Sequence, residues 1–171
     1  MKLLTSILAA SALTAFTFAA DAPLAVGAAA PELSAKDQDG KAVNFKDVYA
    51  KGATLVYFYP KADTPGCTKQ GCSLRDNWDD LTKKGIQVLG VSGDKPEAQK
   101  AFRDKFTFPF PLIADDDGKV AAAFGVQAMK PGIFKRTSFV VKGGKIVWNM
   151  TDKTTTDTHA ADVIKAVEAL K

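Results

Sequence analysis

The sequence is poor in the side chains that bind metal ions. Its 171 residues include only two cysteines, Cys67 and Cys72, and a single histidine, His159. A zinc site built from cysteine and histidine needs four such ligands, so this class of site is excluded. The acidic run at 115–118 lacks the alternating spacing and terminal glutamate of a calcium loop, which favours an ordinary turn. We expect neither a metal ion nor a bound cofactor.

The sequence also lacks a concentration of charge of one sign. There are 23 basic and 19 acidic residues, a formal net charge of +4, and no basic run exceeds two residues. A nucleic-acid surface requires a concentrated patch of lysine and arginine, so the sequence predicts a mixed-charge surface and no nucleic-acid partner. The length and the 46% of hydrophobic residues are typical of one globular domain, which excludes a disordered tail.

Long uncharged runs are confined to the N-terminus. Residues 1–20 combine the single charge of Lys2 with an apolar stretch that ends in small residues. This order is typical of a secretory signal peptide, and it predicts cleavage near Ala19 or Ala20 and a periplasmic or secreted mature chain. The alternative is a membrane anchor, but the span is at the short limit for crossing a bilayer and is interrupted by serine and threonine. After cleavage we expect no stable membrane insertion.

Beyond this leader, strand patterns and helix patterns alternate. Residues 21–32 are interpreted as a lead-in segment and residues 33–171 as a single domain. The expected elements are a hairpin within Leu33–Phe45, a buried strand Ala53–Tyr59, a helix Pro65–Lys84, a buried strand Ile86–Val91, a helix from Pro96, a helical turn Lys119–Phe124, strands Thr137–Val141 and Lys145–Trp148 joined by Gly143-Gly144, and a closing helix with Ala160, Val163, Ile164, Val167 and Leu170 on its apolar face.

This order of elements predicts the sheet. The crossover helix requires the first two buried strands to be parallel, whereas the late hairpin is antiparallel. The sequence therefore predicts an α/β domain with a mixed central sheet flanked by helices and an N-terminal β-hairpin extension. The pattern resembles a thioredoxin-like fold.

The reactive chemistry is expected where the first buried strand meets its helix, because ligands of open α/β sheets bind beyond the carboxyl ends of parallel strands. Thr64 followed by Pro65 is typical of a helix start, with the threonine hydroxyl as the cap. Cys67 then lies in the first turn. Unpaired N–H groups and the positive end of the helix dipole stabilise a thiolate there, and the thiolate is the nucleophilic form of cysteine.

Helical spacing separates the two cysteines. One face of the predicted helix, which we expect to pack on the sheet, repeats at intervals of three and four: Cys67, Gly71, Leu74, Trp78 and Leu81. Cys72 lies one step off this face. Five residues of helix place two Cα atoms about 8.7 Å apart, beyond the ~6.8 Å limit for a disulfide. A permanent disulfide would require the helix to be absent, whereas a transient one needs only local opening, which suits an attacking and a resolving cysteine.

Two further side chains bear on the site. Arg136 precedes a strand that we expect to run antiparallel to the first buried strand, so it lies at the edge where Tyr59 ends. From there we expect Arg136 to reach Cys67, to stabilise its thiolate and to bind an anion or polar oxygen. His159 lies in the polar start of the last helix, and we interpret it as a solvated surface side chain without partners. A cysteine hydrolase, which needs a histidine, is therefore disfavoured.

The segment at 57–72 resembles a peroxiredoxin active site. The family pattern Pro-x-x-x-Thr-x-x-Cys is matched at Pro60, Thr64 and Cys67. The second cysteine, Cys72, makes the segment similar to the bacterioferritin-comigratory, or Q-type, branch of atypical two-cysteine peroxiredoxins. The resemblance extends from about residue 26 to the C-terminus. Two features depart from the branch, because many members have glutamate at the position of Gln70 and most members are cytosolic.

The resemblance implies a thiol-dependent peroxidase acting on hydrogen peroxide and organic hydroperoxides. Cys67 would form a sulfenic acid, and Cys72 would convert it to an intramolecular disulfide. An external dithiol, thioredoxin or a periplasmic equivalent, would reduce that disulfide. Arg136 and Thr64 would hold the peroxide oxygens, and Pro60 would shield the thiolate from water. We expect a monomer.

Two other functions stay open on the sequence alone. A thiol-disulfide carrier would use the same cysteines, although a thioredoxin-type carrier has two residues between them and this chain has four. A non-catalytic module would use Cys67 and Cys72 as a structural disulfide. Substituting Cys72 discriminates, because loss of a structural disulfide costs about 2–5 kcal/mol of stability, whereas loss of a resolving cysteine stops turnover and leaves the fold intact.

Overall fold

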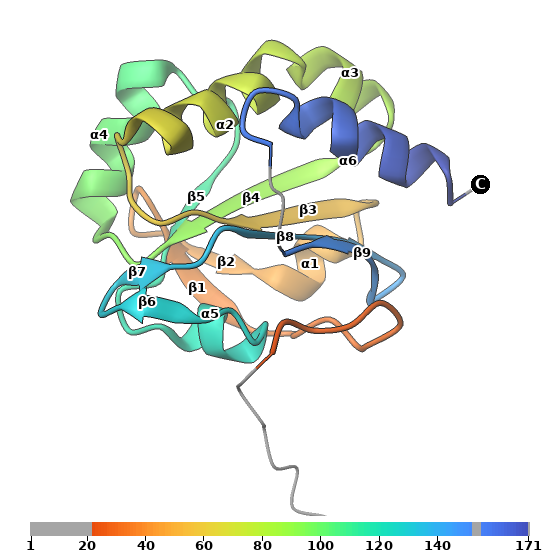
Figure 1. The fold of residues 1–171 in the computed structure, drawn as a ribbon, viewed down its shortest axis with the longest axis horizontal. Coiled ribbons are helices and arrows are strands. Elements are labelled where there is room, and N and C mark those ends of the chain that lie inside the picture. The colour runs from red at the N-terminus through yellow and green to blue at the C-terminus, as the bar shows by residue number, and fades with distance from the viewer. Residues whose placement is uncertain (1–21, 152–154, 171) are drawn as a thin grey trace, which may run out of the picture.

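The computed structural model describes residues 22–151 and 155–170, and the predicted signal peptide at 1–20 lies outside these residues. Helices pack on both faces of a central sheet (Figure 1). The elements in chain order are β1 (Ser34–Asp37), β2 (Ala42–Asn44), α1 (Phe45–Tyr49), β3 (Thr54–Phe58), α2 (Pro65–Asp76), α3 (Trp78–Lys83), β4 (Gln87–Ser92), α4 (Pro96–Phe106), β5 (Leu112–Ala114), α5 (Lys119–Ala123), β6 (Ala128–Lys130), β7 (Ile133–Phe134), β8 (Thr137–Lys142), β9 (Lys145–Met150) and α6 (His159–Glu168).

The sheet has the predicted mixed topology. Its strand order is β2-β1-β5-β4-β3-β8-β9. β3 pairs in parallel with β4 and β4 in parallel with β5, whereas β3 pairs antiparallel with β8 and β8 with β9. Gly143 and Gly144 form the turn of the β8–β9 hairpin. Their backbone φ angles of 58° and 72° are the positive values that a two-residue hairpin turn requires. The α/β fold class is confirmed.

Alternation along β3 divides the core into two layers. Leu55, Tyr57 and Tyr59 face a cluster with α2, α4 and α6, whereas Val56 and Phe58 face a cluster with α1 and α5. Successive side chains of a strand point to opposite faces, so a strand covered on both sides is apolar throughout. This explains why the continuous apolar run at 53–59 predicted a buried strand. Cys67 belongs to the first of these layers.

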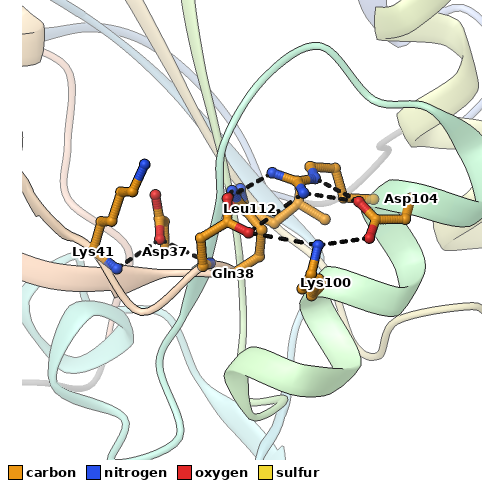
Figure 2. A network of polar contacts seen from close by, with 8 residues as sticks. Asp37, Gln38, Lys41, Lys100, Asp104 and Leu112 are labelled. Carbon is orange, nitrogen blue, oxygen red and sulfur yellow. Dashed lines mark hydrogen bonds and ion pairs between the residues drawn. The ribbon is translucent and has the colours of Figure 1, made fainter.

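The N-terminal hairpin is fastened to the rest of the sheet by polar side chains (Figure 2). The Asp37 carboxylate accepts a 2.9 Å hydrogen bond from the backbone N–H of Asp39, which shapes the turn. The Gln38 amide oxygen accepts from the backbone N–H of Leu112 on β5 at 2.7 Å. Arg103 on α4 pairs with Asp39 at 2.7 Å. The predicted hairpin therefore extends the sheet as its edge, with β1 paired to β5.

The predicted single helix at 65–84 is wrong in one respect, because it breaks at Asn77. The backbone of Asn77 has φ −109° and ψ 20°, and the residue separates α2 from α3. Its side-chain N–H donates to the backbone carbonyl of Ser73 at 2.9 Å. Asparagine competes for backbone groups in this way, which disfavours a continuous helix. The short elements α1, β6 and β7 were not predicted either, and the strand that follows α4, β5, was predicted without bounds.

Both ends of the described chain pack against the central sheet. The backbone N–H groups of Gly27 and Ala30 donate to carbonyls of Ile146 and Gly144, so the lead-in segment runs along the β9 edge. α6 buries Ala160, Val163 and Val167 among the described residues, as its apolar periodicity predicts, and covers the same face as α2. No helix in the described ranges is both long and apolar enough to cross a membrane.

Candidate active site

The start of α2 positions Cys67. Thr64 is the N-cap residue with an extended backbone, φ −91° and ψ 152°, and Pro65 occupies the first turn. Cys67 is the third helical residue, so its own N–H lies among the first four, which have no partner within a helix. Its side chain is 2% exposed. The chain therefore presents a sheltered thiol at the positive end of a helix dipole.

The structure corrects the expected cap at Thr64. No side-chain hydrogen bond from Thr64 caps the helix. Its hydroxyl instead donates to the backbone carbonyl of Lys61 at 3.1 Å, within the same loop. The Thr64 oxygen therefore acts as an acceptor in this conformation, because its single proton is engaged.

Antiparallel pairing of β3 and β8 brings Arg136 to the cysteine. The register places Thr137 opposite Phe58, so the residue before β8 lies at the edge where β3 ends. Arg136 Nη2 donates to Cys67 Sγ at 3.3 Å. Gly66 leaves room for this contact, since a Cβ atom at Gly66 would lie 3.3 Å from the same nitrogen. The guanidinium therefore directs one N–H group at the sulfur, with its positive charge beside it.

The loop that carries Pro60 and Thr64 is held from the end of β4. Asp94 accepts hydrogen bonds from the backbone N–H of Ala62 at 2.7 Å and from the Ser92 hydroxyl at 2.8 Å. Pro60 is half-buried where β3 gives way to this loop. The part played by Asp94 was not predicted from the sequence. The available signal was its place just beyond the carboxyl end of a parallel strand adjacent to β3.

The interpretation of His159 as a solvated side chain is wrong, because the residue is completely buried. Its Nδ1 lies 3.1 Å from Nε2 of Gln70, and its Nε2 lies 2.9 Å from the Ser138 hydroxyl. Arg136 in turn donates to the Gln70 side-chain oxygen. Burial lowers the pKa of His159 to about 4. Gln70 is completely buried three residues after Cys67. Residues three apart on a helix are neighbours, so this spacing was the available signal that Gln70 lies beside the cysteine.

Cys72 is half-buried, and both cysteines are free in a continuous α2. This agrees with the expectation that an intact helix holds them apart. Gly71 between them lies against the ring of Phe108, and a Cβ atom at Gly71 would approach Phe108 Cζ to 2.5 Å. The second turn of α2 therefore fits closely against the aromatic residues behind it.

The acidic run at 115–118 forms a turn and a helix cap. Asp115 is buried, and its carboxylate accepts from the backbone N–H groups of Val120 and Ala121 at 2.9 and 2.8 Å. Burial raises the pKa of Asp115. Across the described ranges, no group of three or more potential metal ligands gathers. These carboxylates serve the start of α5.

Known proteins resemble this chain over most of its length. The AhpC/TSA family matches residues 26–149. Peroxiredoxin Bcp of Escherichia coli strain K12 is 45% identical over 144 residues, covering 80% of this chain and 92% of its own. Chloroplastic peroxiredoxin Q of Oryza sativa subsp. japonica is 35% identical over 146 residues, covering 84% of this chain and 67% of its own.

Solved structures share the fold. Peroxidoxin BcpB of Mycobacterium tuberculosis has a TM-score of 0.80 at 29% identity and covers 85% of this chain and 97% of its own. Peroxiredoxin Q of Xanthomonas campestris has a TM-score of 0.74 at 29% identity, covering 85% and 96%. Its sequence matches therefore show that the chain belongs to the AhpC/TSA family and is a peroxiredoxin, a thiol peroxidase similar to Bcp and peroxiredoxin Q.

Proposed function

We propose that the protein is an exported peroxidase that reduces hydrogen peroxide and organic hydroperoxides through Cys67 and recycles through Cys72. The observation that carries the proposal is the 3.3 Å contact between Arg136 Nη2 and Cys67 Sγ at the start of α2. Membership of a thiol peroxidase family favours this function over a thiol-disulfide carrier or a non-catalytic module.

In the first step the Cys67 thiolate attacks one peroxide oxygen. An S–O bond forms, the O–O bond breaks, and hydroxide or alkoxide leaves and takes up a proton, so the sulfur becomes a sulfenic acid. Arg136 and the backbone N–H of Cys67 stabilise charge on the leaving oxygen. The Thr64 oxygen, whose proton is directed to a backbone carbonyl, accepts the peroxide O–H and so orients the substrate. Pro60 limits the access of water.

In the second step α2 opens locally and Cys72 attacks the sulfenic sulfur. A disulfide forms between Cys67 and Cys72 and one water molecule is released. The helix must open because its geometry keeps the two Cα atoms about 8.7 Å apart, beyond disulfide range. An external dithiol then reduces the bond, yielding both thiols and its own disulfide. For an exported protein, this reductant is a thioredoxin-like dithiol of the periplasm or cell exterior.

Stopped-flow fluorescence of the fully reduced protein mixed with hydrogen peroxide tests the proposal. Trp78 begins α3 and contacts Phe110, with ring centroids 5.7 Å apart, so it reports on opening of the adjacent α2. We expect a fast second-order phase that is lost in Cys67→Ser. Cys72→Ser should stall as a sulfenic acid that dimedone traps. A wild-type rate no faster than that of a free thiol contradicts the proposal.

The proposed export and oligomeric state are tested apart from the chemistry. Mass spectrometry of protein from fractionated cells should find a mature N-terminus near residue 20 or 21 in the periplasm or medium. A cytosolic protein that retains residues 1–20 contradicts export and leaves the peroxidase proposal standing. We expect a monomer in sedimentation experiments, and a stable dimer at micromolar concentration contradicts that expectation.

A further inference from the structure

The candidate nucleophile stands at one end of a line of buried polar contacts. Arg136 donates to Cys67 Sγ through Nη2 and to the side-chain oxygen of Gln70 through Nη1. Gln70 meets His159 Nδ1 at 3.1 Å, and Ser138 meets His159 Nε2 at 2.9 Å. Gln70, His159 and Ser138 are each completely buried. The line joins α2, the start of β8 and the first residue of α6, so three elements converge on the cysteine.

The chemistry of the donors fixes the direction of every bond in this line. A guanidinium carries only donors, so the Gln70 atom that faces Arg136 is its oxygen. The Gln70 NH₂ group then faces His159, and Nδ1 of the imidazole must accept. A neutral imidazole has one proton, which must therefore be on Nε2, where it is donated to the Ser138 hydroxyl oxygen. For a neutral ring, the position of the imidazole proton therefore follows from the fact that the guanidinium of Arg136 can only donate.

A proton on His159 Nδ1 would break this line. Two donors would then meet, and a rotated Gln70 amide would turn its NH₂ group toward the guanidinium of Arg136. Burial disfavours the imidazolium, as does the positive charge of Arg136, whereas Asp162 on the same helix favours it. From β3, Tyr57 packs its ring against the imidazole, with centroids 5.7 Å apart. The surroundings therefore hold the ring neutral at physiological pH.

We propose that His159 is a positioning residue for the reaction of Cys67. As a neutral imidazole protonated on Nε2, it holds the Gln70 amide with its oxygen toward Arg136, and this fixes the guanidinium on the sulfur. The inference rests on the proposed peroxidase function and adds to it a residue that touches neither substrate nor cysteine. It also gives a physical meaning to glutamine at position 70, because an amide both accepts from Arg136 and donates to His159.

The matched substitution Gln70→Glu reverses the demand on the imidazole. A carboxylate accepts on both sides, so it satisfies Arg136 but requires a donor from His159 Nδ1. We therefore expect the variant to place a proton on Nδ1 and to raise the pKa of His159. In the wild-type protein, Nδ1 should stay unprotonated until the pH approaches the lowered pKa of about 4.

Because the chain has one histidine, ¹⁵N NMR of imidazole-labelled protein reads this residue without ambiguity. The wild type should show the Nε2–H tautomer at pH 7, and Gln70→Glu should show a protonated Nδ1. An Nδ1–H tautomer in the wild type, or a titration midpoint near the ordinary 6.5, overturns the inference. This measurement needs no peroxide and no substitution of His159.

Kinetics then test the positioning role. His159→Leu removes the acceptor for the Gln70 amide, and we expect the second-order oxidation of Cys67 to slow about tenfold, the usual worth of one oriented hydrogen bond. His159→Asn keeps an acceptor close to the position of Nδ1, so it should restore the rate to within about threefold of the wild type. Val163→Ala removes apolar contacts of the same helix, lowers stability and should leave the rate unchanged.

The outcomes separate the two proposals. If Cys67 is oxidised rapidly in the wild type and equally rapidly in a folded His159→Leu variant, the positioning role is refuted and the peroxidase function stands. Equal slowing in His159→Leu and Val163→Ala also refutes it, because the effect would then be one of packing. A wild type no faster than a free thiol refutes the proposed function and the role that rests on it. If His159→Leu does not fold, the tautomer in the wild type and in Gln70→Glu decides.

Discussion

We predict that lowering the pH from 7 to 4 removes about 3 kcal/mol from the free energy of unfolding through His159 alone. Burial lowers the pKa of this side chain from 6.5 to about 4 in the folded protein. The unfolded chain exposes the imidazole and returns its pKa to about 6.5. Between these two pH values the unfolded state binds a proton that the folded state does not, so stability falls as the pH falls. The two pKa values differ by about 2.5, and each pKa unit corresponds to about 1.4 kcal/mol. Because the folded-state imidazole is already half protonated at pH 4, the loss by that pH is slightly less than the full product, about 3 kcal/mol.

Urea unfolding followed by circular dichroism at pH 7, 6, 5 and 4 measures this effect. Carboxylates also titrate in the window, so the informative quantity is the free energy of unfolding of the wild type minus that of His159→Asn. Carboxylate contributions are common to both proteins and largely cancel in this difference. We expect this difference, wild type minus variant, to become more negative by about 3 kcal/mol as the pH falls from 7 to 4.

Val163→Ala supplies the control for this experiment. The substitution truncates a completely buried side chain one turn after His159 on α6, and it changes no titrating group. The difference in the free energy of unfolding between wild type and Val163→Ala should therefore be the same at every pH. A pH-independent difference between wild type and His159→Asn would mean that the imidazole is solvated, and a difference that grows as the pH falls would mean that it is paired as a cation. Either result refutes the reasoning from burial.

Three further predictions concern the surroundings of the cysteine. Gly71→Ala should lower the free energy of unfolding, measured in urea, by about 1 kcal/mol. The new Cβ would lie 2.5 Å from Phe108 Cζ, and this overpacking outweighs the gain of about 1 kcal/mol in helix propensity. A more stable variant contradicts the close fit. Asp94→Ala releases the backbone of Ala62 and should slow peroxide oxidation about tenfold, with the far-ultraviolet spectrum unchanged; an unaltered rate means the loop is fixed by other contacts. Arg136→Lys should slow the same reaction at least about 100-fold, because a single ammonium replaces a fork that contacts sulfur and amide together; retention of the wild-type rate shows that charge alone suffices.

Local physical chemistry predicted much of the fold. The apolar and β-branched run at 53–59 predicted β3, because a strand covered on both faces has no polar alternation. Thr64-Pro65 predicted the start of α2, since proline has a helical φ and no N–H to satisfy. Gly143-Gly144 predicted the late hairpin, since its turn requires positive φ. Each signal acts over a few neighbouring residues, which is why the sequence alone carries it.

Topological reasoning extended this to part of the site. The crossover helix implied that β3 and β4 are parallel, and β8 was expected to run antiparallel beside β3. This arrangement places Arg136 at the end of β3, next to Cys67. The break at Asn77 was missed, because whether a side chain competes with the helix backbone depends on packing around it. Asp94 was missed as well, since its partner at Ala62 is 32 positions away and has no distinctive side chain.

The sequence by itself determined the helix that carries both cysteines and the place of Cys67, the candidate nucleophile, in its first turn, because helix-start signals and spacing along one helix act locally. Only the tertiary structure decided the surroundings of His159. A histidine in a polar stretch at a helix start is exposed by every local criterion. It is buried because α6 packs its first turn against α2 and β8, which brings Gln70 to it from 89 positions away and Ser138 from 21. Burial depends on what covers a residue, and elements distant in the chain supply that cover.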